Sequence, residues 1–311
     1  MRLVVFGAGA VGSRFAVGLA RAGSEVTIVA RPEHAAAVTA NGLGVEADAQ
    51  GPVRIRALER LPVPYSAELV VLTVKSYDVE TAGRALAEAL DQPTPVLALQ
   101  NGLGIEEALS TGLSLGGWKT PLDWILRGVH TVPARLVGPG LVAETGEGAV
   151  VLGRNPKLPG WPDRLKELFE SAGFPARVVD DIRRETWRKA IVNAAINPVT
   201  ADHGIPNGRL VEEPWRGQAL ALLREAVLAA RAEGIDFDLD ETERAVFTVA
   251  RATAANRSSM LEDLDHHRRT EIDAISGVLL ATGRAHGVPM PATVRAIERI
   301  RTREHERGVR P

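Results

Sequence analysis

The stretch that decides the fold is RLVVFGAGAVG, residues 2–12. Its apolar, β-branched run Arg2–Phe6 predicts a buried strand, and a helix is expected from Val11 to Ala22. Between them the glycines follow the pattern G-x-G-x-x-G. In such a loop the first glycine permits a tight turn, the second lets phosphates approach the backbone, and the third lets the helix pack against the strand. The pattern predicts a dinucleotide site formed by Gly7, Ala8, Gly9, Ala10, Val11 and Gly12.

Outward from this loop, short apolar runs alternate with helical stretches, as in a parallel sheet with crossover helices. Further strands are expected at Glu25–Ala30, Leu69–Val74, Val96–Leu99 and Ala176–Val179, with helices at Val79–Leu90 and Asp163–Ser171. After Gly128, short strands at 129–136, 141–144 and 149–152 suggest an antiparallel extension at one sheet edge. From about Ile182 the periodicity is almost wholly helical. We therefore expect an α/β fold: a Rossmann-type domain over residues 1–180 with that edge extension, then an all-α domain over 181–311.

Composition limits the function classes. The 311 residues are 45% hydrophobic and 24% charged, as in soluble globular proteins, and the net charge of −2 gives no reason to expect nucleic acid or an anionic membrane as partner. The absence of cysteine excludes disulfides, thiolate nucleophiles and Cys-based metal sites. No apolar run is long enough to span a bilayer, so a cytoplasmic protein is expected. No metal site is predicted, because the neighbouring histidines His266 and His267 point apart on a helix.

The ends of the expected strands indicate which cofactor binds. NAD sites usually carry an acidic residue after the second strand, whereas this strand ends in Ala30-Arg31. An arginine offers a fork of donors suited to a phosphate, which favours NADPH; alternatively, Arg31 stacks on adenine or is solvated. Lys75 and Asn101 close two later strands, where a parallel sheet presents its ligands, although either is compatible with an ordinary turn.

A second polar pattern lies in WRKAIVNAAIN, residues 187–197. On a helix, Lys189, Asn193 and Asn197 are four residues apart and share one face. The chain has only five lysines and seven asparagines, so this column within an apolar helix is not explained by composition or by helix propensity. It suggests a face that grips a polar molecule. The alternative is a partly buried helix whose lysine snorkels and whose amides bond to nearby backbone.

Together with the glycine loop, the motifs WRKxxxNxxxNP from Trp187, PNG from Pro206, SSMLxD from Ser258 and TEID from Thr270 resemble those of the ketopantoate reductases. The resemblance covers essentially the whole chain, and several motifs follow in order at compatible intervals. It implies NADPH-dependent reduction of a small 2-keto acid, 2-dehydropantoate, in pantothenate and coenzyme A synthesis. Such a protein has a small-molecule substrate; the oligomeric state stays open, a homodimer included.

The resemblance also implies roles for individual residues. Lys189 would donate a proton to the carbonyl oxygen, and Glu271 would orient Lys189 and reach the nicotinamide. The expected substrate contacts are Lys189, Asn193, Asn197, Asn207, Ser259 and Asn101. The expected cofactor contacts beyond the glycine loop are Arg31, Lys75, Asn101, Ala134 and Glu271. Independently of the family, a hydride arriving at a carbonyl carbon leaves negative charge on oxygen, which a nearby ammonium can stabilise and protonate. Glu271 beside Thr270 also fits an ordinary carboxylate at a helix N-terminus.

Three alternatives remain at this point, and the first is a reductase with the same framework that acts on another branched 2-keto acid. β-Hydroxyacid dehydrogenases also join a Rossmann domain to a helical domain with a Lys-x-x-x-Asn helix, but we know no counterpart there for SSMLxD and TEID. A non-enzymatic NADPH sensor would need no proton donor. One stretch departs from the family pattern: Gly116–Arg127 is longer than expected and holds two of the five tryptophans. It is interpreted as a lid, a subunit contact or an edge insertion, and its role is left open.

Overall fold

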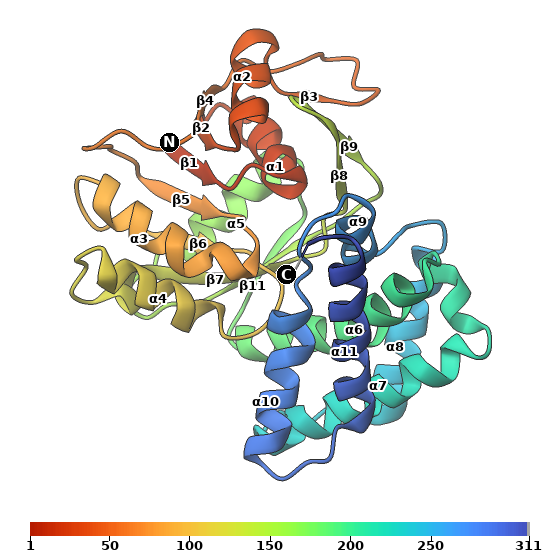
Figure 1. Ribbon diagram of the computed structural model, residues 1–311. Helices are drawn as coiled ribbons and strands as arrows, with labels where there is room; N and C mark the ends of the chain where they lie inside the picture. The colour runs from red at the N-terminus through yellow and green to blue at the C-terminus, as the bar shows by residue number, and fades with distance from the viewer. Residues whose placement is uncertain (310–311) are drawn as a thin grey trace. The chain divides into compact units, whose positions relative to one another are not determined.

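The computed structural model describes residues 1–309 and divides the chain into two compact units (Figure 1). The sheet unit comprises residues 1–100 and 104–185, and the helical unit comprises residues 101–103 and the described chain from Thr186 onward. This architecture confirms the predicted fold class, an α/β domain followed by a helical one. Within residues 1–309, no helix is long and apolar enough to cross a membrane.

The sheet unit is built on an eight-stranded sheet in the order β11-β10-β7-β6-β5-β1-β2-β4. Its strands are β1 (Arg2–Phe6), β2 (Glu25–Val29), β4 (Arg56–Leu58), β5 (Leu69–Leu72), β6 (Val96–Ala98), β7 (Ile125–His130), β10 (Val150–Gly153) and β11 (Ala176–Val179). The six strands from β4 to β7 run parallel, and β10 pairs antiparallel with β7. Because all six point the same way, the loops after β1, β2, β5 and β6 lie at one edge, where a parallel sheet binds its ligands.

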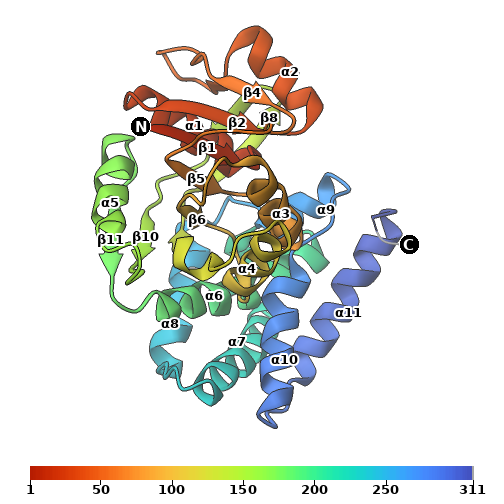
Figure 2. The same cartoon turned by 90° about the vertical axis from the view of Figure 1, so that its left-hand side faces the viewer.

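Helices cover both faces of this sheet. They are α1 (Ala10–Arg21), α2 (Pro32–Asn41), α3 (Val79–Ala89), α4 (Ile105–Leu115) and α5 (Trp161–Ser171), with 3₁₀ turns η1 (Ser76–Asp78) and η2 (Pro121–Trp124). Side chains alternate between two cores along each strand: Leu3 and Val5 join α1 and α5, whereas Val4 joins α3 and α4. Both views show α3 and α4 side by side (Figure 1, Figure 2). This two-sided burial explains why the strands are apolar throughout.

The predicted antiparallel edge extension is only partly correct. The expected strand 129–136 is two strands, because β7 ends at His130 and β8 (Ala134–Gly138) begins a different sheet. That smaller sheet has the order β3-β9-β8, with β3 (Gly44–Val45) parallel to β9 (Leu141–Glu144) and β8 antiparallel to it. The sequence pattern missed it because β3 comes from far upstream and is only two residues long.

The tryptophan-bearing stretch Gly116–Arg127 contributes Trp118 and the first residues of β7 to the domain core, whereas Leu122 is 60% exposed. It contains η2 and leads into β7, whose first three residues pair with β6 inside the sheet. Trp118 is 8% exposed and packs edge-to-face on Trp124 at a centroid distance of 6.3 Å. The stretch therefore connects α4 to an interior strand of the main sheet.

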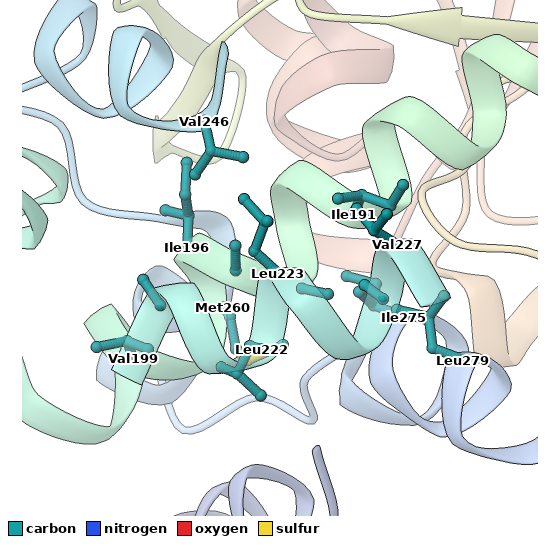
Figure 3. Close-up of a cluster of buried hydrophobic side chains, with 14 of the residues drawn as sticks. Ile191, Ile196, Val199, Leu222, Leu223, Val227, Val246, Met260, Ile275 and Leu279 are labelled. Atoms are coloured by element: carbon teal, nitrogen blue, oxygen red, sulfur yellow. The ribbon is translucent and has the colours of Figure 1, made fainter. Parts of the chain in front are cut away.

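The helical unit packs around one apolar core (Figure 3). Its elements are α6 (Ile182–His203, within this unit from Thr186), η3 (Asn207–Val211), α7 (Trp215–Ala232), α8 (Leu239–Ala252), α9 (Ser259–Asp265), a π-helical turn η4 (Asp273–Gly277), α10 (Val278–Ala285) and α11 (Pro291–Glu306). Ile191 of α6 and Leu223 and Val227 of α7 all belong to this core (Figure 3). α6 ends where Gly204 takes a positive φ of 66°, a conformation that glycine adopts without strain.

Candidate active site

The glycine loop between β1 and α1 has the geometry of a phosphate cradle. Gly7 has a φ of +97°, and a Cβ there would lie 2.5 Å from the Val74 amide nitrogen. A Cβ on Gly12 would lie 2.5 Å from Thr73 Oγ1, so side chains are excluded at both positions. Gly9 differs, because nothing lies within 4 Å of its Cβ position. The middle glycine therefore leaves open space in front of the backbone, where a ligand can approach.

The N-terminus of α1 supplies the donors for that space. Gly9 is its N-cap and has no side chain to satisfy the first amides. The amide of Ser13 is the first to bond within the helix, to the Gly9 carbonyl at 2.9 Å. The amides of Ala10, Val11 and Gly12 therefore have no acceptor inside the helix, and no acidic residue occupies its first turn. The loop and helix fit a pyrophosphate, since amide donors and the positive end of the helix dipole favour an anion.

Side chains brace this edge of the sheet from strand to strand. Thr73 Oγ1 donates to the Gly7 carbonyl at 3.0 Å, and Gln100 Nε2 donates to the Leu72 carbonyl at 2.9 Å. Arg127 Nη2 in turn donates to the Gln100 carbonyl at 2.9 Å. These bonds link the ends of β1, β5 and β6 to β7. The rim that carries the glycine loop is thus held by hydrogen bonds in addition to the sheet ladder.

Arg127 is the most buried cation in this rim. It is 5% exposed, and its guanidinium also donates to the carbonyls of Ala98 at 3.0 Å and Gly128 at 2.8 Å. Burial lowers the pKa of the guanidinium, and the charge of Glu106, 3.5 Å away, opposes this shift. The sequence contains no sign of this role, because two of the carbonyls that Arg127 binds, those of Ala98 and Gln100, lie in a distant segment of the chain.

Three of the other residues predicted for the cofactor, Arg31, Lys75 and Ala134, lie next to or at strand ends of the sheet unit. Arg31 is exposed, lies just after β2 and occupies the N-cap position of α2, with no capping bond from its side chain to the described residues. Lys75 is half-buried and precedes η1, and half-buried Ala134 is the first residue of β8. Ala134 thus belongs to the smaller sheet, which the sequence did not predict.

In the helical unit, α6 carries the polar column of Lys189, Asn193 and Asn197. Lys189 and Asn193 are half-buried, whereas Asn197 is 5% exposed. Asn197 Nδ2 is buried and finds no hydrogen-bond acceptor within residues 1–309. A buried donor without a partner costs about 1–3 kcal/mol, so a bound polar ligand would remove a penalty here.

Within the described chain, Asn207 has a buried acceptor without a hydrogen bond, whereas Asn197 has a buried donor without one. It is 8% exposed and its Nδ2 donates to Thr253 Oγ1 at 3.0 Å, which assigns its Oδ1 as the acceptor. That Oδ1 is buried and receives no hydrogen bond from the described residues. The helical unit therefore holds both an unsatisfied donor, on Asn197, and an unsatisfied acceptor, on Asn207. A ligand with hydroxyl and carbonyl groups would satisfy both.

Two segments 170 residues apart meet at Glu271. Asn101 Nδ2 donates to Glu271 Oε2 at 3.1 Å, and Glu271 is 6% exposed. Next to Asn101, Gly102 lies so close to η4 that a Cβ would be 2.5 Å from the Ala274 carbonyl oxygen. Residues 101–103 therefore belong to the helical unit although β6, which ends at Ala98, is separated from them by only two residues. The π-helical turn that receives them is a rare conformation, frequent at functional sites.

A residue of α11, Glu304, fixes the loop that carries Glu271. Glu304, which is fully buried, accepts from both the backbone amide and the hydroxyl of Thr270 at 2.7 Å each. Thr270 Oγ1 also accepts from the Ile272 amide at 3.3 Å. Thr270 and Glu304 are thus part of one buried hydrogen-bond network. The sequence did not indicate this role for Glu304.

Of the serine pair, the predicted Ser259 is exposed and is the first residue of α9. Its neighbour Ser258 is 5% exposed and acts as the N-cap, with Oγ accepting from the Leu261 amide at 3.3 Å and from Thr200 Oγ1 at 2.7 Å. The hydroxyl of Ser258 is therefore hydrogen-bonded inside the fold, whereas Ser259 is exposed.

The fold and the polar site define a class, the oxidoreductases that join a Rossmann-type domain to a helical domain. Two family models match the chain: ketopantoate reductase PanE/ApbA over residues 3–157, and ketopantoate reductase PanE/ApbA C terminal over residues 181–304. The 2-dehydropantoate 2-reductase of Vibrio cholerae serotype O1 is 33% identical over 304 residues, 98% of each chain. That of Archaeoglobus fulgidus is 35% identical over 289 residues, 92% of each chain. The chain belongs to the ketopantoate reductase family and is an oxidoreductase, as the motifs predicted.

Solved structures agree with this assignment. A PanE/ApbA family ketopantoate reductase from Ralstonia eutropha JMP134 is 31% identical and superposes with a TM-score of 0.87, covering 99% of this chain and 100% of that one. The structure of D-mandelate dehydrogenase with NADH and anilino(oxo)acetate is 25% identical, with a TM-score of 0.92 and full coverage of both chains. The same fold therefore occurs in a dehydrogenase whose ligands include NADH.

Proposed function

We propose that this protein reduces 2-dehydropantoate to pantoate with NADPH, a step in pantothenate and coenzyme A biosynthesis. The observation that carries the proposal is the pair of buried, unsatisfied amide groups on Asn197 and Asn207, which accompany Lys189 in one unit. 2-Dehydropantoate carries a hydroxyl, a keto group and a carboxylate, so it offers acceptors and a donor to such a site. The relatives named above bear the name of this activity.

The glycine loop supports a nicotinamide dinucleotide as cofactor, and Arg31 supports NADPH over NADH. Residues 10–12 would hold the pyrophosphate through their amides, and Gly9 leaves the room for it. Arg31 follows β2 at the position where NAD enzymes usually carry an acid that binds the ribose hydroxyls. An exposed guanidinium there suits a 2′-phosphate instead. Lys75 and Ala134 are proposed as further contacts on the same cofactor.

The chemistry then follows from residue types. NADPH, when bound, supplies a hydride to the keto carbon. As charge grows on the carbonyl oxygen, Lys189 stabilises it and donates a proton from Nζ, which yields the alcohol. Asn193, Asn197 and Asn207 orient the hydroxyl and carbonyl groups, and exposed Ser259 receives the carboxylate. Acid catalysis of this kind contributes roughly 10²- to 10⁴-fold.

Glu271 and Asn101 form the remaining part of the proposed site. Their hydrogen bond fixes the orientation of both side chains, and buried Glu304 fixes the backbone next to Glu271. A carboxylate held in this way can orient the Lys189 ammonium by attraction, while Asn101 presents its carbonyl oxygen to substrate or cofactor.

A steady-state assay tests the substrate assignment. NADPH oxidation is followed with 2-dehydropantoate, with 2-oxophenylacetate as the aromatic 2-keto acid related to mandelate, and with a 3-oxo acid. We expect kcat/KM to be highest for 2-dehydropantoate by at least about tenfold, a difference of about 1.4 kcal/mol in transition-state binding. Preference for the aromatic acid would replace the proposed substrate, and cofactor binding without any turnover would refute an enzymatic role.

The cofactor assignment is tested with Arg31→Ala. NADPH and NADH dissociation constants are measured by fluorescence titration for the wild type and the variant. The substitution removes a charge-assisted contact worth about 1.5–3 kcal/mol, so the NADPH constant should rise about tenfold or more while that of NADH changes little. Equal losses for the two cofactors would contradict the role of Arg31.

A further inference from the structure

A histidine that the proposed chemistry does not use lies buried behind the glycine loop. His34, in the first turn of α2, is 5% exposed. Its Nε2 lies 3.0 Å from the hydroxyl of Ser13 on α1, and its Nδ1 lies 3.1 Å from the amide nitrogen of Gly140, in the turn between β8 and β9. Ser13 Oγ is in turn 3.3 Å from the Ala8 carbonyl oxygen in the glycine loop. A single line of hydrogen bonds thus joins three elements that are distant in sequence.

The direction of these bonds fixes the state of the imidazole. The Gly140 amide can only donate, so Nδ1 must accept and carries no proton. Nε2 then carries the proton and donates to Ser13, whose hydroxyl donates onward to the Ala8 carbonyl. A doubly protonated ring could not accept from Gly140, so the complete line requires neutral His34.

The surroundings favour that neutral state. Burial lowers the pKa of the His34 imidazole below its ordinary value of 6.5. The charged groups on the elements around it are Arg14 and Arg21 on α1, Glu33 on α2, Arg135 on β8 and Glu144 on β9. Arg14 pairs with Glu144 at 2.9 Å, Arg21 pairs with Asp48, and Arg135 lies 3.7 Å from Glu46. None of these groups makes a hydrogen bond to the ring among the described residues.

We propose that His34 is a positioning residue of the cofactor site. Through Ser13 it holds the Ala8 carbonyl, and therefore the turn of the glycine loop, while its own backbone belongs to the helix that begins after Arg31. One buried ring thus fixes the position of the loop proposed to bind the pyrophosphate. It also fixes the position of the start of α2, next to the residue proposed to bind the 2′-phosphate. The smaller sheet, through Gly140, anchors the ring from the other side. This inference rests on the proposed function only in taking NADPH as the cofactor.

The test compares NADPH dissociation constants of the wild type with those of Ser13→Ala, His34→Asn and the double variant. Ser13→Ala removes one oxygen. His34→Asn keeps an acceptor near the Nδ1 position for Gly140 but does not reach Ser13. We expect each single variant to raise the constant about tenfold, and the double variant to be no worse, because both changes break the same link. The control is His286→Gln on the surface of the helical unit, which should bind NADPH like the wild type.

A second readout separates positioning from a general loss of structure. In the wild type, NADPH affinity should fall more steeply than in His34→Asn as the pH is lowered below 6.5, the ordinary pKa of histidine, because the ring titrates only in the former. The 2′-phosphate of NADPH titrates in the same way with both proteins, so its effect cancels when the two pH profiles are compared. The turnover number at saturating NADPH should stay close to the wild-type value in Ser13→Ala, with the loss confined to KM for NADPH.

Three results would overturn the proposal: wild-type affinity in Ser13→Ala, additive losses in the double variant, or identical pH profiles. If His34→Asn does not fold, Ser13→Ala decides alone. If the wild type binds NADPH no better than NADH, the cofactor assignment fails on its own. The His34 comparison is then made with NADH, because the glycine loop serves the pyrophosphate of either cofactor.

Discussion

The middle glycine of the loop allows a sharp test of where the dinucleotide lies. Gly9 is the N-cap of α1, its φ is −79°, and its Cβ position has no neighbour within 4 Å. Gly9→Ala is therefore compatible with the fold, and the added methyl group projects into the space left for a ligand. We expect this substitution to impair cofactor binding and to leave stability almost unchanged.

The effect on stability is the sum of two small opposing terms. Replacing glycine by alanine at a compatible φ reduces the freedom of the unfolded chain and stabilises by about 0.4–1 kcal/mol. Alanine is a poorer N-cap than glycine by about 0.5–1 kcal/mol. The two nearly cancel, so the free energy of unfolding should change by less than about 0.5 kcal/mol.

The effect on binding is larger. A methyl group in front of the amides of residues 10–12 pushes a pyrophosphate out of hydrogen-bond range. Each hydrogen bond to a charged group contributes about 1.5–3 kcal/mol, so losing one should raise the NADPH dissociation constant roughly 10- to 100-fold. The constant is measured by NADPH fluorescence titration, and stability by thermal and urea unfolding of the same samples.

Two matched glycines make the comparison specific. Gly160 is the N-cap of α5 with a φ of −85° and an equally open Cβ position, so Gly160→Ala should change neither stability nor binding. Gly12→Ala places a Cβ 2.5 Å from Thr73 Oγ1 and should destabilise by about 1–3 kcal/mol. An NADPH constant in Gly9→Ala within about twofold of the wild type would refute the placement of the pyrophosphate.

Three further predictions concern other parts of the molecule. Lys189→Ala should lower turnover about 10²- to 10⁴-fold while NADPH still binds, and near-normal turnover would remove this residue from the mechanism. Arg127→Met should lower the free energy of unfolding in urea by about 2–4 kcal/mol, because three carbonyls each lose a hydrogen bond from a buried donor; a change below about 1 kcal/mol would contradict the bracing role. The pKa of His34 is lower in the folded protein than its ordinary 6.5, so the unfolded chain binds the proton more readily. Its contribution to stability is therefore complete above that value and is lost as the pH falls through the lowered pKa; wild-type and His34→Asn proteins with the same acid dependence of unfolding would disprove this.

Local patterns carried much of the fold. Arg2–Phe6 and the glycines after it follow from apolar runs and from the steric needs of a tight turn, and both elements are present. The column Lys189, Asn193 and Asn197 follows from helical spacing, and α6 contains all three. These features depend on neighbours within a few residues, which a single sequence displays.

Features that depend on distant partners were missed. β3 is recognisable only through its pairing with β9, and the short strand has no periodicity of its own. Arg127, Glu304 and His34 look like ordinary polar residues until the carbonyls, amides and hydroxyls of remote segments surround them. Burial of such groups is set by tertiary structure, so composition and spacing do not reveal it.

The docking of residues 101–103 against η4 makes the two halves of this protein inseparable by a single cut. The polypeptide passes from one compact unit to the other at three places, after residues 100, 103 and 185. A truncation after residue 185 would remove the contact of Gly102 with Ala274 and the hydrogen bond of Asn101 to Glu271. Chimaeras that exchange the helical half between relatives should therefore carry these three residues along with it.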